Sequence, residues 1–113
     1  MHRDVKPHNF VINHEKKLLK LVDFGLSDYY FPGDEYNLSV ASRYYKAPEL
    51  FIGIHNYHYS LDVWSTGAIF AGMLFKRDPF FKGRNSQRQL EKIKKYQENL
   101  SQHFQRLRDQ NTS

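Results

Sequence analysis

Apolar and polar positions alternate in a way that predicts a β-hairpin near the start of the chain. Residues 10–12 and residues 18–22 are short apolar runs, and the stretch between them, residues 13–17, is polar. Two short apolar runs joined by a polar turn are typical of two paired strands. We therefore expect an antiparallel hairpin over residues 10–22.

Residues 23–49 show no steady hydrophobic period. They contain the turn sequence Pro32-Gly33-Asp34 and several tyrosines. This pattern predicts a long ordered loop, and loops of that length usually carry a function.

The pattern changes at Ser60, which is followed by a mostly apolar stretch, residues 61–75. Ser60 is a suitable N-cap, and Asp62 lies in the first turn, where the helix dipole favours a carboxylate. We expect Lys76 and Arg77 at the C-terminus of this helix and Pro79 to end it. A helix that is apolar nearly all round is predicted to be buried in the centre of the domain.

A second helix is predicted in the tail, beginning with Ser86 and Gln89 as a capping box. Its apolar residues recur at steps of three and four, with one polar member in the row: Leu90, Ile93, Gln97, Leu100, Phe104 and Leu107. Such a stripe fits a short coiled coil or an amphipathic helix packed on its own domain. We favour the packed helix, because the stripe covers too few heptads for a secure coiled coil. The fold class expected is mainly α with a short β-hairpin.

Composition limits the classes of protein to consider. The 113 residues, with a formal net charge of +5, are enough for one small domain. Cysteine is absent, which excludes disulfides and thiolate metal sites. We read the charge as a solvated basic face, and nucleic-acid binding, which rests on net charge alone, ranks last. The apolar stretch is too short and too polar at one end for a membrane span, so we expect a protein of the cytoplasm or nucleus.

The hairpin brings chemically active residues to one place. Asn9 precedes its first strand and Asp23 follows its second, and the open ends of antiparallel strands lie together. A carboxamide and a carboxylate are oxygen ligands that suit Mg²⁺. Asp4 and Lys6 lie at the same end. A carboxylate base, a lysine and a metal clamp together suit phosphoryl transfer.

Three motifs in order resemble the signature of the protein kinase family: His2-Arg3-Asp4 through Asn9, then Asp23-Phe24-Gly25, then Ala47-Pro48-Glu49. The fold this implies is part of the C-terminal lobe of a protein-kinase-like α+β domain. The position of Lys6, two residues after Asp4, resembles the serine/threonine class.

The resemblance implies a role for each matching residue. Asp4 would orient the substrate hydroxyl, and Lys6 would meet the γ-phosphate as charge develops. Ser42 would bridge these two side chains, and Asn9 and Asp23 would bind Mg²⁺. Structural support is implied for seven residues: His2, Arg3, Phe24, Gly25, Glu49, Asp62 and Trp64. Among them, Arg3 would anchor the activation segment and Asp62 would hold the catalytic-loop backbone.

Longer stretches resemble the catalytic alpha subunits of casein kinase 2: HRDVKPHN, PGDEYN, VASRYYKAPEL, YSLDVWSTG and DPFFKG. The resemblance covers residues 1–94, and residues 95–113 form a divergent basic helical tail. It implies ATP, with GTP as a second nucleotide, Mg²⁺, and acidic protein substrates. Arg43 and Lys46 match basic positions that favour acidic substrates in that family. An internal salt bridge is the alternative for Arg43.

Three positions depart from that family: Phe24 stands where it usually has Trp, Ala47 where it has Gly, and Ser39 where it has Arg. The change at Ser39 removes one of three basic contacts and so weakens the case for acidic selectivity.

Several parts of a kinase are not in these 113 residues: a glycine-rich loop, a strand lysine paired to a helix glutamate, an adenine hinge and an Arg partner for Glu49. We therefore expect a partial kinase domain that is inactive by itself. The regulatory beta subunit of casein kinase 2 would be a partner only with the small lobe present. The alternative is a non-catalytic interaction module that self-associates through the stripe at residues 86–107.

Overall fold

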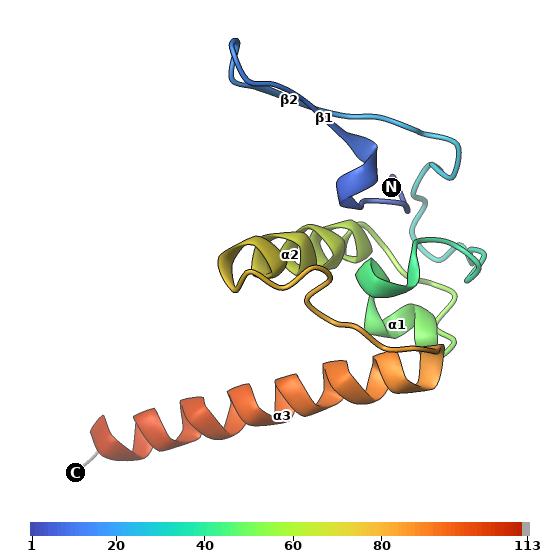
Figure 1. Cartoon of the computed structure of the whole chain (residues 1–113). Helices are drawn as coiled ribbons and strands as arrows, with labels where there is room; N and C mark the ends of the chain where they lie inside the picture. The colour runs from blue at the N-terminus through green and yellow to red at the C-terminus, as the bar shows by residue number, and fades with distance from the viewer. Residues whose placement is uncertain (112–113) are drawn as a thin grey trace.

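The structure is a computed structural model that describes residues 1–111. Its elements in order are η1 (Pro7–Asn9), β1 (Phe10–Asn13), β2 (Leu18–Leu21), η2 (Arg43–Tyr45), α1 (Pro48–Phe51), α2 (Ser60–Leu74) and α3 (Ser86–Asn111). Figure 1 shows the hairpin and the N-terminus on one side of α2 and the long α3 on the other. The prediction of a mainly α fold with a short β-hairpin is confirmed.

The hairpin forms where the apolar runs predicted it. Strands β1 and β2 are antiparallel, with Phe10 opposite Leu21 and Asn13 opposite Leu18. The Asn13 side chain accepts a hydrogen bond from the Lys16 backbone N–H at 2.9 Å and so stabilises the turn. At the open end, the Val22 N–H donates to the Asn9 carbonyl at 2.8 Å. This bond ties the residue before β1 to the residue after β2.

Helix α2 starts and stops slightly differently from the prediction. Ser60 is its first helical residue and Tyr59 is the N-cap, so the expected Ser60 cap is wrong. The helix ends at Leu74, before Lys76 and Arg77, because Lys76 has a left-handed φ of 52°. The chain then folds back over Gly72, where a Cβ would lie 2.7 Å from the Arg77 carbonyl oxygen. The left-handed turn at Lys76, rather than Pro79, therefore ends the helix, and the Arg77 N–H closes it by donating to the Gly72 carbonyl at 2.8 Å.

Only one side of α2 is covered by residues 1–111, which corrects the expectation of a helix buried all round. Leu61, Ser65 and Ala68 face the core. The opposite side exposes large apolar side chains, Val63, Phe70, Met73 and Leu74, and Phe75, directly after the helix, is exposed as well. A helix with apolar residues on every side needs neighbours on every side, and among the described residues they occupy one side.

The core consists of two clusters around α2. The first joins the loop before α1, α1 itself and the start of α2: Val40, Ala47, Leu50, Tyr57 and Leu61. The second joins η2, the middle of α2 and α3: Tyr45, Ala68, Phe81 and Ile93. Trp64 packs against both clusters and so connects them.

The start of α3 differs from the predicted capping box. Asn85, not Ser86, caps the helix, because its Oδ1 accepts the Arg88 N–H at 2.8 Å. The Gln89 side chain, which is fully buried, accepts the Gly83 N–H at 2.6 Å. Its amide also donates to the Phe81 carbonyl at 3.0 Å. Gln89 thus satisfies buried backbone groups of the preceding loop instead of the helix end.

Helix α3 packs on the domain only near its start. Gln89 and Ile93 are buried, whereas Leu100, Phe104 and Leu107 are 55%, 57% and 42% exposed. Figure 1 shows the later turns extending away from the body. The packed-helix interpretation therefore holds for the first turns alone. The predicted division after residue 94 falls within this helix and remains a prediction, and residues 112–113 of the predicted tail lie outside the described residues.

None of the helices within residues 1–111 combines the length and the apolar character needed to cross a membrane.

Candidate active site

The loop at residues 2–9 is held in place by the first turn of α2. Both carboxylate oxygens of Asp62 accept backbone N–H groups from this loop, from His2 at 2.7 Å and from Arg3 at 2.9 Å. Arg3 adopts a left-handed φ of 66°, which turns the chain sharply at this point. The carboxylate therefore fixes a strained turn directly before Asp4.

His2 connects this loop to the end of the hairpin. Its Nε2 lies 3.0 Å from the Val22 carbonyl oxygen, and its Nδ1 accepts the Asp4 N–H at 3.2 Å. A carbonyl only accepts, so Nε2 carries the proton and Nδ1 is the acceptor. The Phe24 ring packs edge-on against the imidazole at 5.0 Å. Both side chains thus lie in packing positions, although Phe24 is 64% exposed.

Asp4 is the centre of a small polar network. Its Oδ1 accepts from the Ser42 hydroxyl at 3.3 Å, and its Oδ2 accepts from the Asn9 amide at 3.1 Å. The Lys6 ammonium lies 3.3 Å from Asp4 Oδ2 and donates to Ser42 Oγ at 3.1 Å. Asp4, Lys6 and Ser42, which the sequence assigned to one site, therefore lie in mutual contact.

This network can orient a hydroxyl and stabilise negative charge. Asp4 is only 8% exposed, so its carboxylate is held by protein groups rather than by bulk water. The ammonium beside it supplies positive charge in a place where water screens it little. A carboxylate acceptor next to a lysine suits a reaction in which a hydroxyl loses its proton while a phosphoryl group gains charge.

The predicted magnesium ligands fit a metal ion in their donor atoms. Asn9 uses its amide nitrogen for Asp4, donating to the carbonyl at 2.8 Å as well as to the carboxylate, which leaves Oδ1 without a bond among the described residues. Asp23 accepts the Gly25 N–H through Oδ1 at 3.2 Å, and its Oδ2 has no hydrogen bond within residues 1–111. Two oxygen ligands of this kind suit Mg²⁺, which takes its other ligands from phosphate and water. Asp23 has a left-handed φ of 60°, so the backbone turns just after β2.

Arg3 lies where an anchor for the following segment would be. Its guanidinium donates to the Leu26 carbonyl at 2.6 Å and to the Tyr57 hydroxyl at 3.2 Å. It also lies 3.5 Å from Asp28 Oδ2. The side chain thus joins the loop at residues 2–9 to the start of the long loop and to Tyr57 beyond its end.

The two candidate substrate-binding residues make internal contacts with backbone carbonyls. Arg43 is exposed and donates to the Arg84 carbonyl at 2.8 Å. Lys46 donates to the Leu38 carbonyl at 2.8 Å and lies over the Phe51 ring. Burial lowers the pKa of the Lys46 amine, because desolvation penalises its charged form. Arg43 therefore presents its charge to solvent more fully than Lys46 does.

The remaining support residues lie around this centre. Glu49 is in α1, in its first turn, and its side chain makes no ion pair within residues 1–111. The Trp64 ring stacks on Phe81 at 5.8 Å, and its Nε1 has no hydrogen-bond partner within the same range. Gly25 follows Phe24 with its α-carbon close to Asp23, since a Cβ there would lie 3.1 Å from Asp23 Oδ1.

Tyr57 is a residue of the site that sequence reasoning missed. It is 2% exposed, and its hydroxyl donates to the Asn37 carbonyl at 2.6 Å while accepting from Arg3. It therefore joins the catalytic loop to the long loop. It stands in a polar stretch of histidine, asparagine and tyrosine, where no pattern distinguishes it from a surface residue.

Comparison with known families agrees with this geometry. The family model described as the protein kinase domain matches residues 1–113, which is the whole chain. Members of this family transfer phosphoryl groups and generally use ATP and Mg²⁺. A match over the full length, together with the contacts around Asp4, leads to one conclusion: the chain belongs to the protein kinase family.

Proposed function

We propose that this chain is part of a serine/threonine protein kinase that transfers the γ-phosphoryl group of ATP to hydroxyls in acidic protein segments. We include GTP as a second nucleotide, because the sequence motifs resemble those of casein kinase 2 catalytic subunits. The observation that carries the proposal is the contact of Asp4, Lys6 and Ser42, with the Lys6 ammonium 3.3 Å from Asp4 Oδ2.

Each residue has a defined task in this proposal. Asp4 accepts a hydrogen bond from the substrate hydroxyl and aims its oxygen at the phosphorus. Lys6 neutralises charge that develops on the transferred group, and Ser42 bridges the two side chains through hydrogen bonds to both. Asn9 and Asp23 would hold Mg²⁺, which supplies positive charge to the phosphate oxygens.

Selectivity for acidic substrates is proposed to depend mainly on Arg43. The Arg43 guanidinium is exposed and uses one nitrogen for the Arg84 carbonyl, which leaves further donors for a carboxylate. The single ammonium of Lys46 is partly buried and already bound to the Leu38 carbonyl. Ser39, with its N–H bound to the Asn37 side chain, adds no charge beside them.

The test uses the endogenous protein, whatever its full length, captured with an antibody against residues 95–111. Its intact mass is measured first, and then its Mg-ATP-dependent phosphorylation of an acidic serine peptide and an arginine-rich one. We expect a mass well above the 13.5 kDa of these 113 residues. We also expect the acidic peptide to react faster by about tenfold, through charge complementarity.

Two substitutions make this test specific. Asp4→Asn should lower the rate by at least ~100-fold, since it removes the base without changing size. Ser39→Arg should raise the preference for the acidic peptide by about threefold, and Ser39→Gln, which adds bulk without charge, should not. Equal rates on both peptides, unchanged by Ser39→Arg, would contradict the proposed selectivity. Activity that survives Asp4→Asn would contradict the proposed site.

A second function is supported by the exposed end of α3. Leu100, Phe104 and Leu107 lie on one face of a helix that extends from the body, and all three are at least 42% exposed. We propose, as the alternative, that the chain is an interaction module that self-associates through these three residues.

Sedimentation equilibrium of the 113-residue chain tests the alternative. The wild type should associate, and Leu100→Lys/Phe104→Lys should be monomeric, because two charges oppose burial of the stripe. A matched control, Gln102→Lys/Gln105→Lys, adds the same charge at exposed polar positions of α3 outside the stripe. A monomeric wild type contradicts self-association through this helix.

A further inference from the structure

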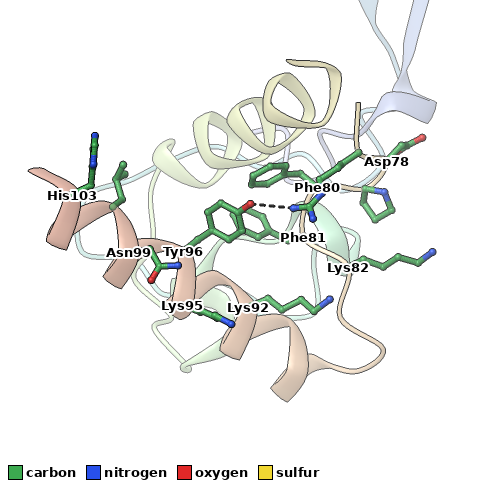
Figure 2. Close-up of a pocket in the computed structure, with 12 residues that line it drawn as sticks. Asp78, Phe80, Phe81, Lys82, Lys92, Lys95, Tyr96, Asn99 and His103 are labelled. Carbon is green, nitrogen blue, oxygen red and sulfur yellow. Dashed lines mark hydrogen bonds between the residues drawn. The ribbon is translucent and has the colours of Figure 1, made fainter. Parts of the chain in front are cut away.

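A pocket lies between the loop that follows α2 and the first half of α3. Its volume is about 860 Å³, within the range of sites that hold several side chains. Residues 77–82 form one wall and α3 forms the other (Figure 2). Figure 1 places α3 on the side of α2 away from residues 2–9, so this pocket is separate from the candidate active site.

The rim of the pocket is cationic. Arg77 and Lys82 come from the loop, and Lys92 and Lys95 come from α3. The two helix lysines are three residues apart and so lie on one face. Figure 2 shows them on the helix with Lys82 across from them on the loop.

These cations make no ion pair within residues 1–111, whereas other cations of the same helix do. Glu91 pairs with Arg88 at 2.8 Å and Glu98 pairs with Lys94 at 3.9 Å. The acidic residue of the pocket, Asp78, accepts a hydrogen bond from the Tyr45 hydroxyl. Two other cations of α3 are therefore paired, whereas the charge in the pocket is left positive.

The floor of the pocket is aromatic. Tyr96 packs edge-on against Phe80 at 4.9 Å and against Phe81 at 5.6 Å. Its hydroxyl accepts a hydrogen bond from Arg77 at 3.1 Å, the dashed line in Figure 2. Tyr96 nevertheless remains 44% exposed. An apolar floor surrounded by a charged rim is the anatomy of a protein-recognition surface.

We propose that this pocket binds an acidic peptide segment that carries one aromatic or aliphatic side chain. Carboxylates of the segment pair with the four cations, and the apolar side chain rests on the rings. A peptide fits better than a single-stranded nucleic acid. Successive bases need successive rings to stack on, and here Tyr96 and both phenylalanines are packed against one another.

The test measures fluorescence anisotropy of a short labelled peptide in which Asp and Glu surround one Phe, titrated with the 113-residue chain. Salt is held at about 0.15 M, where screening limits charge effects to a range of about 8 Å. The pocket variant is Lys92→Glu/Lys95→Glu. It should bind at least ~10-fold more weakly, since it replaces two attractions with two repulsions.

The matched control is Lys16→Glu/Lys20→Glu, which makes the same change of net charge at exposed positions of the hairpin. We expect it to change affinity by less than ~2-fold, because the hairpin lies on the side of α2 away from α3 (Figure 1) and salt screens charges that are far from the peptide. Glutamate is as good a helix former as lysine, so circular dichroism should show α3 intact. Lys92→Gln/Lys95→Gln removes the two positive charges without adding negative ones that repel the peptide. It should lower the affinity by an intermediate factor of about three.

Two comparisons complete the design. A peptide with Ser in place of the Phe should bind at least ~3-fold more weakly if the aromatic floor takes part. A thymidine oligonucleotide should bind more weakly than the peptide. The proposal is overturned if the wild type does not bind the peptide. It is also overturned if the pocket variant Lys92→Glu/Lys95→Glu and the hairpin control Lys16→Glu/Lys20→Glu lose affinity for the peptide equally. Equal affinity for the Ser peptide and the Phe peptide would overturn it as well. So would an oligonucleotide that binds the wild type more tightly than the peptide does and binds the pocket variant more weakly than the wild type.

Discussion

Asp62 uses both carboxylate oxygens to hold two consecutive backbone N–H groups of the loop that carries Asp4. The residues involved are 59 and 60 positions apart in sequence, so a single side chain connects α2 to the N-terminal loop. Bonds to a charged acceptor are the stronger kind of hydrogen bond, and their partners here are partly buried. The position of Asp4 therefore depends on a residue far from it along the chain.

Asp62→Ala should lower the free energy of unfolding by about 2–4 kcal/mol, because two N–H groups lose their acceptor. Urea denaturation followed by circular dichroism measures this loss. The control, Asp34→Ala, removes the same charge from an exposed loop position and should cost less than about 0.5 kcal/mol. Equal effects of the two substitutions would show that net charge, rather than the two bonds, accounts for the loss.

Tyr45 gives the chain a pH dependence at the alkaline end. Burial, with a smaller contribution from nearby Asp78, raises the pKa of its hydroxyl above the ordinary tyrosine value. The folded state therefore favours the protonated form. The stability that this gives is fully present below about pH 10, the pKa of an unfolded tyrosine, and is lost as pH rises through the folded value.

Tyr45→Phe should accordingly lose less stability than the wild type between about pH 10 and about pH 11.5, a window that begins at the ordinary tyrosine pKa of about 10. Lys46, whose lowered pKa acts in the opposite sense, is present in both proteins, so their difference isolates Tyr45. The control is Tyr29→Phe, at a residue that is 82% exposed. Parallel stability curves for Tyr45→Phe and the wild type would contradict this assignment.

Among the elements, α3 is attached to the domain by a buried side-chain amide. Gln89 binds the Gly83 N–H and the Phe81 carbonyl, and Gly83 has no room for a side chain. A Cβ on Gly83 would lie 2.4 Å from the Gln89 backbone nitrogen. The loop and the first turn of the helix therefore pack backbone to backbone, and the amide satisfies the polar groups that this contact buries.

Gln89→Leu should lower the free energy of unfolding by about 2–4 kcal/mol, since similar size is kept while buried polar groups lose their partners. Thermal unfolding followed by circular dichroism gives the change. Gln102→Leu, at an exposed position of the same helix, should change it by less than about 0.5 kcal/mol. If Gln89→Leu left the free energy of unfolding unchanged, the Gly83 N–H and the Phe81 carbonyl would have found other hydrogen-bond partners.

At the scale of the whole molecule, the apolar face of α2 is open. Its four exposed side chains, Val63, Phe70, Met73 and Leu74, are each at least 62% exposed, and Phe75, directly after the helix, is 61% exposed. Contiguous apolar surface of this kind promotes association or marks a contact with further protein. The 113-residue chain should therefore bind a hydrophobic dye and associate as concentration rises.

Phe70→Lys/Met73→Lys should reduce dye fluorescence and concentration-dependent light scattering by at least ~2-fold, because it interrupts the patch. Unchanged helix content is the condition for comparing the two proteins. If Leu100→Lys/Phe104→Lys abolishes association instead, the contact is made by α3 and not by α2.

Local patterns predicted the elements well. The hairpin followed from two apolar runs and a polar turn, and α2 followed from the long apolar stretch after Ser60. Both depend on neighbours along the chain, which a sequence contains directly. The cap at Asn85 was missed, because it and Ser86 are both good N-caps and only the position of the Arg88 N–H decides between them.

The site was predictable to the extent that its residues follow short motifs. Asp4, Lys6 and Asn9 stand within one loop, and the motif order led to Ser42 and Asp62 as their partners. The structure brings the side chains of Asp4, Lys6, Asn9 and Ser42 into contact and binds Asp62 to the backbone of the same loop. The roles of Tyr57 and Gln89 could not be predicted, because the local sequence does not distinguish a buried tyrosine or glutamine from an exposed one.

The sequence by itself determined the hairpin, α2 and α3, the loop with its reactive side chains and the excess of positive charge, since each depends on composition or on spacing between neighbours. The tertiary structure decided which face of α2 is covered, which cations of α3 are left unpaired and which amide holds the loop. Those outcomes depend on residues tens of positions apart meeting in space, and no local pattern records such distances.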